Sequence, residues 1–78
     1  MKEYNIRLST IEDVRSFVNV VSLCEYDVDV SCGRYIVDGK SIIGLFSLDL
    51  LSPLRMTVHA DDVGDLEERL ARFLEQSV

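Results

Sequence analysis

Residues 39–50 limit the fold more than any other part of this chain. They follow a polar run, Asp38-Gly39-Lys40-Ser41, which is typical of a turn that leads into the N-cap of a helix. The apolar block after Ser41 is too short, and too interrupted by Gly44, to be a strand of a sheet, so we predict a short helix. One short helix cannot turn all of its apolar residues inward, and these are Ile42, Ile43, Leu45, Phe46, Leu48 and Leu50.

Helical spacing divides these apolar residues between two faces. Ile42 and Phe46 are four residues apart and share one face, whereas Leu45 and Leu48 share another. We expect Leu45 and Leu48 to point into the core and Ile42 and Phe46 to face solvent. The alternative is that two of the three residues Ile42, Ile43 and Phe46 belong to the core. An exposed apolar patch on a small domain usually marks the binding site of a partner.

Size and charge exclude several classes of protein. A chain of 78 residues makes one small domain, which buries only about 60% of its unfolded surface. The net charge of −6 argues against nucleic acid as a partner, because phosphates require clustered Lys and Arg. No stretch has the roughly 20 apolar residues of a transmembrane helix, and residues 1–4 lack the layout of a signal peptide. We therefore expect a cytoplasmic protein without membrane contact, whose partners are proteins or small molecules.

Few residues could carry chemistry. We expect Cys24 and Cys32 to be free, partly buried thiols rather than a disulfide or a metal pair. The single histidine, His59, should lie on the open face of the sheet, and the spacing places no carboxylate or cysteine beside it. The sequence therefore predicts neither a metal site nor a cofactor.

The first third of the chain predicts a strand followed by a helix. Residues 4–8 alternate apolar and polar side chains, which indicates a half-buried strand with Tyr4 facing inward. Ser9 and Glu12 match the capping box of a helix start. The helix should continue to about Leu23, and its apolar face has helical spacing, formed by Ile11, Val14, Phe17, Val18 and Val21.

Two further strands predict a hairpin. Residues 26–31 and 34–37 alternate again, and Cys32-Gly33 between them suggests a tight turn in which Gly33 supplies a positive φ. If Ser31 pairs with Arg34, then Val30 lies opposite Tyr35 and Val28 opposite Val37, all on the core side. Ile36 would then face outward beside Asp29.

The last third predicts one more strand and a final helix. Residues 54–60 alternate most regularly, with Leu54, Met56, Val58 and Ala60 inward. Aspartates gather before the last helix, where its dipole favours anions, and the buried stripe is Leu66, Leu70, Phe73 and Leu74. The predicted class is therefore α+β, an open-faced β-sandwich in the order βαββαβα, with helices over one face of an antiparallel sheet.

This order of elements, together with residues 39–48, resembles HPr, the histidine-containing phosphocarrier of the bacterial sugar phosphotransferase system. The resemblance covers nearly the whole chain as one domain, 1–78. Residues 25–30 look like the family's second strand, and residues 56–60 with the acidic residues after them look like its fourth. The resemblance implies a four-stranded antiparallel sheet in the order 1-4-2-3.

The resemblance fails where the family carries its phosphate. The phosphoacceptor histidine of HPr lies at the start of the first helix, with an arginine close behind it. Alignment of the helices places Glu12 at the histidine position and Val14 at the arginine position, and the loop before them is shorter. A glutamate has no imidazole nitrogen to accept phosphate from enzyme I, so we predict no catalytic residue and no enzyme.

The resemblance also implies roles for residues 41–46. Ser41 occupies the position of a regulatory serine that a kinase phosphorylates in some bacteria; the alternative is a simple N-cap. Ile42, Ile43 and Phe46 match positions that contact enzyme I, the kinase and transcriptional regulators. Glu12 could mimic a phosphorylated histidine by its charge, although the capping box explains it as well.

Three functions compete on these grounds. The first is a non-catalytic HPr-like module that binds phosphotransferase-system or regulatory proteins through Ile42, Ile43 and Phe46. The second is an atypical phosphocarrier that uses His59 or Glu12 as its acceptor. The third is a small-molecule-binding α+β domain that shares only the layout.

Overall fold

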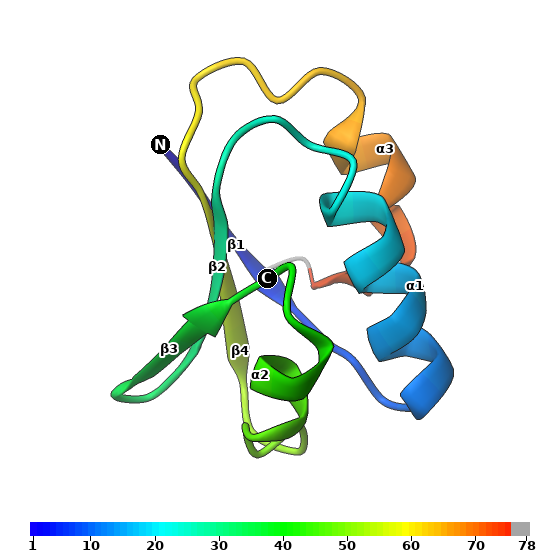
Figure 1. Cartoon of the computed structure of the whole chain (residues 1–78), viewed down its shortest axis with the longest axis vertical. Helices are drawn as coiled ribbons and strands as arrows, with labels where there is room; N and C mark the ends of the chain where they lie inside the picture. Colours follow the sequence, from blue (N-terminus) through cyan, green and yellow to red (C-terminus); the bar gives the residue numbers. More distant parts are fainter. Residues whose placement is uncertain (76–78) are drawn as a thin grey trace.

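Five strands form one antiparallel sheet in the computed structural model of the chain, which describes residues 1–75. The strands are β1 (Lys2–Ile6), β2 (Val28–Cys32), β3 (Tyr35–Asp38), β4 (Leu54–Val58) and β5 (Leu74–Glu75). Their order across the sheet is β3-β2-β4-β1-β5. The helices α1 (Ile11–Val21), α2 (Ile42–Phe46) and α3 (Leu66–Arg69) lie against one face of this sheet (Figure 1). The predicted α+β class is confirmed.

The sheet differs from the prediction at one edge. Its first four strands follow the expected order 1-4-2-3, but the fifth strand β5 pairs with the outer side of β1, so the prediction of a four-stranded sheet is wrong. A continuous helix through Leu74 is also wrong. The helix α3 ends after four residues, and the 3-10 helix η1 (Ala71–Phe73) leads into β5.

The predicted buried stripe survives this change of structure. Leu66, Leu70 and Phe73 are buried, whereas Leu74 is half-buried and belongs to β5. The amide of Arg7 donates to the Phe73 carbonyl at 2.8 Å, which draws the chain alongside the end of β1. Pairing with the edge of β1 therefore outweighs the helical spacing of these residues, because it satisfies backbone groups while the same side chains stay in the core.

The core forms between the sheet and α1. Of the four residues predicted to face inward in the last strand, Leu54, Met56 and Val58 are buried, whereas Ala60 lies beyond the end of β4 and is half-buried. Ile6 of β1 and Val28 of β2 are buried too. The helix α1 contributes the buried residues Val14, Phe17, Val18 and Val21. Ile11 was predicted on this face, but it is 60% exposed because it lies in the first turn, beyond the edge of the core.

The hairpin of β2 and β3 has a different register from the predicted one. Cys32 pairs with Tyr35 and Val30 with Val37, so the two-residue turn is Gly33-Arg34. Gly33 has φ of 58°, and it takes the first turn position, where a tight hairpin accepts a positive φ. The shift of two residues preserves the faces, but it carries Tyr35 beyond the core, where the side chain is 73% exposed instead of inward.

Ile36 faces outward as predicted, although its partner across the pair is Ser31 rather than Asp29. Among the helices of residues 1–75, none has both the length and the apolar character to cross a membrane.

Candidate functional site

The helix α2 begins at a serine cap. The backbone of Ser41 is extended, and its Oγ accepts a hydrogen bond from the Gly44 amide at 3.0 Å. This bond satisfies one of the amides that a helix start leaves free. The predicted N-cap is therefore confirmed, and Ser41 is half-buried.

Most apolar residues of α2 face solvent. Leu45 is the only buried residue of this helix, and Leu48 just after it is buried too, as predicted. Ile43 is 81% exposed, Phe46 44% and Ile42 36%. The expected division of the helix into an inner and an outer face is therefore confirmed. We refer to Ser41, Ile42, Ile43 and Phe46 together as the α2 surface.

Close packing fixes the position of α2. A Cβ added at Gly44 would lie 3.2 Å from Ser41 Oγ and 3.3 Å from Val37 Cβ, so the absence of a side chain lets the helix approach β3. Before the helix, the Gly39 amide donates to the Val28 carbonyl at 2.7 Å. The Lys40 ammonium donates to the Cys24 carbonyl at 2.9 Å. These bonds hold the polar turn in place, so the α2 surface is presented from an ordered support.

The helix α1 has a different cap from the predicted one. The predicted capping box of Ser9 and Glu12 is wrong, because Thr10 is the N-cap and its Oγ1 accepts from the Asp13 amide at 3.0 Å. The Asp13 carboxylate accepts in return from the Ser9 amide at 2.9 Å. The sequence offers two adjacent hydroxyl residues, and the extended backbone at Thr10 selects the second. Glu12 is left exposed, without a part in the cap.

The start of α1 has no histidine. Its first residues are Thr10, Ile11 and Glu12, none of which has an imidazole. Val14, which the alignment places at the family's arginine position, is fully buried in the core.

The helices α1 and α2 are in contact. The first turn of α1 and the whole of α2 lie toward the same end of the molecule, at the bottom of Figure 1. The start of α1, which the resemblance to HPr matches to the phosphate-carrying position, therefore lies at the same end of the domain as the α2 surface.

His59 has a carboxylate partner that sequence reasoning missed. Its Nε2 lies 2.8 Å from Asp29 Oδ2, and its amide donates to the Asp27 carbonyl at 3.0 Å. Asp29 lies on β2, the strand beside β4, and the β2–β4 register brings it next to the end of β4. The alternation of polar residues places both side chains on the open face of the sheet. Only the order of the strands, which pairs β2 with β4, shows that they are neighbours.

The surroundings of His59 are acidic. It lines an open hollow of about 430 Å³ together with Asp27, Asp29 and Asp38. A carboxylate on Nε2 orients the ring, yet three negative side chains oppose the approach of a phosphoryl donor. Within residues 1–75, no group of His, Cys, Asp or Glu has the arrangement of a metal site.

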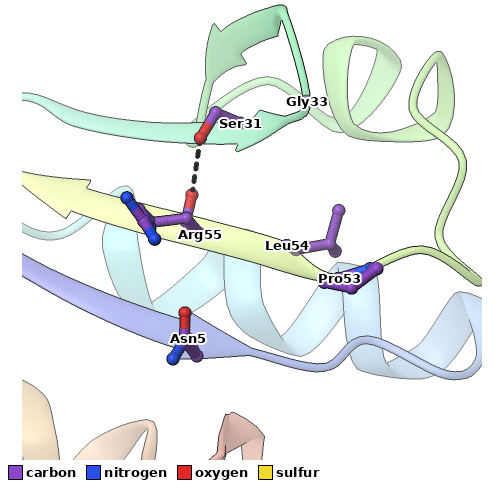
Figure 2. Close-up of a pocket in the computed structure, with 6 residues that line it drawn as sticks. All are labelled: Asn5, Ser31, Gly33, Pro53, Leu54 and Arg55. Atoms are coloured by element: carbon purple, nitrogen blue, oxygen red, sulfur yellow. Dashed lines mark hydrogen bonds between the residues drawn. The ribbon is translucent and has the colours of Figure 1, made fainter.

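A second hollow lies on the open face of the sheet (Figure 2). It has a volume of about 280 Å³, and its polar groups come from three neighbouring strands: Asn5, Ser31 and Arg55. Ser31 Oγ donates to the Arg55 carbonyl at 3.5 Å, and the Arg55 guanidinium pairs with Glu3 at 3.2 Å. The guanidinium is thus already neutralised, and the hollow is below the usual size of a ligand pocket.

Cys24 and Cys32 are free and half-buried, as predicted. The Cys24 thiol lies 3.9 Å from the Val20 carbonyl, and the Cys32 thiol lies 3.9 Å from the Asp49 carbonyl. Both side chains also pack against the edge of the core.

Comparison with known proteins gives a result for structure alone. No protein-family model and no curated protein sequence matches the chain. The structure is similar to HPr-C-His from Thermoanaerobacter tengcongensis, with a TM-score of 0.75 and 24% identity over 92% of this chain and 89% of that one. It is also similar to the phosphocarrier protein HPr from Bacillus anthracis str. Ames, with a TM-score of 0.64 and 21% identity over 91% of this chain and 89% of that one. The chain has the fold of the HPr phosphocarrier proteins.

Proposed function

We propose that this chain is an HPr-like protein-docking module, related to the phosphoenolpyruvate-dependent sugar phosphotransferase system, and that it carries no phosphate at the usual site. The observation that supports this most is the α2 surface: Ile42, Ile43 and Phe46 are exposed on a helix that buries only Leu45. Exposed apolar side chains on an ordered support are the usual anchors of a protein interface. The partners would be cytoplasmic phosphotransferase-system or regulatory proteins.

The start of α1 supports the second half of the proposal. Phosphoryl transfer to a protein needs a nucleophile and fixed donors around the phosphate. The exposed side chains there are those of Thr10, Ile11 and Glu12, and the first turn carries the acidic residues Glu12 and Asp13. The two carboxylates repel an incoming phosphoryl group and make transfer unfavourable. The negative charge of Glu12, which would let it mimic a phosphorylated histidine, is part of this repulsion.

Phosphorylation by enzyme I and phosphoenolpyruvate tests the absence of transfer. We expect no acid-labile phosphate on the wild-type protein. We also expect none on Glu12→His, because a new imidazole would still lack the donors that hold a phosphate. Thr10→His places the imidazole at the N-cap residue, two positions before Glu12, and tests an alignment with HPr that is shifted by two residues. Appreciable transfer to the wild type or to either single variant would contradict this part of the proposal.

Binding tests the docking role. With enzyme I as the probe, isothermal titration should detect binding by the wild type and a weaker interaction with Ile43→Ser. Leu23→Ser is the matched control, because Leu23 is a similarly exposed apolar residue (73%, against 81% for Ile43) just past the C-terminal end of α1. Equal weakening by both variants, or none by Ile43→Ser, would contradict the α2 surface as the docking site.

Ser41 would regulate this docking. A phosphate on its Oγ would add about −1.5 to −2 charges beside Ile42 and Ile43. Desolvation of that charge would oppose burial of the apolar side chains in an interface. Incubation with an ATP-dependent kinase of the phosphotransferase system, followed by mass spectrometry of wild type and Ser41→Ala, would detect the modification and assign it to this serine.

A further inference from the structure

The edge strand β3 is open along its outer side. It is an end strand of the sheet, and within residues 1–75 no strand pairs with its second edge. Two large apolar side chains on it are exposed, Tyr35 by 73% and Ile36 by 68%. Natural proteins usually protect such an edge with a lysine, a proline, a bulge or a covering element. The four-residue strand Tyr35–Asp38 contains no lysine, proline or bulge, and its single charged residue, Asp38, lies at its end.

The hydrogen-bond pattern shows which backbone groups of β3 are free. The Gly39 amide donates to the Val28 carbonyl, and Val30 and Cys32 pair with Val37 and Tyr35. The odd-numbered residues of this segment therefore turn their backbone groups toward β2. Strand geometry alternates this direction, so the N–H and C=O of Ile36 point away from the sheet.

We infer that β3 pairs antiparallel with β3 of a second copy of this chain, centred on Ile36. In this register the two Ile36 residues stand opposite each other and exchange two backbone hydrogen bonds. Tyr35 of each copy lies opposite Val37 of the other, which covers the exposed aromatic ring. The inference concerns self-association and does not depend on the proposed docking function of α2.

Charge complementarity favours a second copy as the partner. With Ile36 at the centre, Arg34 of one copy faces Asp38 of the other, and the twofold axis repeats the pair. Both side chains are exposed, and neither forms an ion pair with another residue between 1 and 75. One oxygen of Asp38 accepts from the Lys40 amide at 2.9 Å, which leaves the other for the arginine. Opposite charges across a strand pair stabilise it, whereas like charges destabilise it.

Sedimentation equilibrium tests the inference. The wild type should change from monomer to dimer between about 10 µM and about 1 mM, the range of small interfaces. Moderate salt is needed because each copy has a charge of −6. Ile36→Pro should remain monomeric and folded, since its lost N–H points outward. Ile36→Thr, which keeps that N–H, is the matched control and should still dimerise.

A charge swap fixes the register. Arg34→Glu and Asp38→Lys should each weaken the dimer about tenfold or more, because each places two like-charge pairs in the interface. Mixed together, the two variants should form a heterodimer, since both contacts are then complementary. Circular dichroism confirms that each variant is folded.

Three results would overturn the inference. They are a wild type that stays monomeric at about 1 mM, a dimer unaffected by Ile36→Pro, and a mixture of the two charge variants that does not associate. A monomer that binds an extended peptide along β3 would leave the edge as a site for another partner and would exclude the second copy.

Discussion

The helices α1 and α2 begin with the same kind of N-cap but differ in how many of their residues they bury. Each has a hydroxyl residue with an extended backbone that accepts from the amide three residues on, Thr10 in α1 and Ser41 in α2. After the cap, α1 continues for eleven residues and buries four of them, whereas α2 has five residues and buries one. The first turn of α1 is acidic, and that of α2 is apolar. The helix α1 is therefore mainly a core element, whereas α2 leaves most of its apolar side chains exposed.

Truncation of a phenylalanine in each helix tests this comparison with the largest expected effect. Phe17 of α1 is fully buried, and its ring meets Phe73 edge-on with centroids 6.2 Å apart. Phe17→Ala should lower the free energy of unfolding by about 3–5 kcal/mol. Phe46→Ala should lower it by less than about 1.5 kcal/mol, because the ring is 44% exposed. Denaturant unfolding of both variants measures the difference, and equal losses would end the distinction between the helices.

The caps should contribute similarly in the two helices. Thr10→Ala and Ser41→Ala each remove an acceptor for one amide, so each should cost about 1 kcal/mol. Ser9→Ala is the control, because the Ser9 side chain makes no cap and only its amide is bonded. A larger loss from Ser9→Ala than from Thr10→Ala would restore the capping box that the sequence predicted.

Alkaline pH affects a part of the molecule outside both helix starts. Partial burial, with a hydrogen bond to Glu67 at 2.6 Å, raises the pKa of Tyr4 from 10.0 to about 12. Burial also raises the pKa of Tyr26. A raised pKa means that the unfolded chain loses these protons first, so stability should fall as the pH rises from about 10 toward 12.

Thermal melting against pH measures this loss. It should be smaller in Tyr4→Phe and unchanged in Phe46→Ala, because the second variant removes no titrating group. A Tyr4→Phe protein with the full alkaline loss would show that the Tyr4 phenol contributes nothing to it.

The smallest expected effect on stability is that of Ser41→Asp. Aspartate is as good an N-cap as serine, and its charge suits the helix start, so the free energy of unfolding should change by less than about 0.5 kcal/mol. The same variant should weaken docking, if negative charge on this residue regulates the α2 surface. Unchanged binding in titrations with enzyme I would remove Ser41 as a switch and leave it as a cap.

The sequence predicted the fold where side-chain alternation and burial agree. The strand with Leu54, Met56 and Val58 and the division of residues 42–48 into two faces were both predicted correctly. The sequence could not choose between Ser9 and Thr10 as the cap, because both residue types are suitable and only the backbone conformation decides. The register of the hairpin was missed by two residues for the same reason. The strand β5 was missed because its pairing with β1 competes with a good helical pattern at Leu70 and Phe73.

The candidate site was predictable in part for the same reason. The sequence of residues 39–50 already predicts a short helix, and a short helix cannot turn all of its apolar residues inward. The exposure of Ile43 and Phe46 was therefore predictable. The contact between His59 and Asp29 joins residues thirty positions apart, and it depends on the order of the strands. Spacing along the chain could not place them together.

The proposal that the apolar residues of α2 serve binding rather than folding can be tested on one variant, Phe46→Ser. Its denaturant unfolding and its titration with enzyme I should be measured on the same preparation, with the wild type beside it. The account predicts an unfolding midpoint near that of the wild type and binding weakened by about 1–3 kcal/mol, which is about 5- to 150-fold in Kd. A Phe46→Ser protein that loses about 3–5 kcal/mol of stability, or that binds as tightly as the wild type, would contradict it.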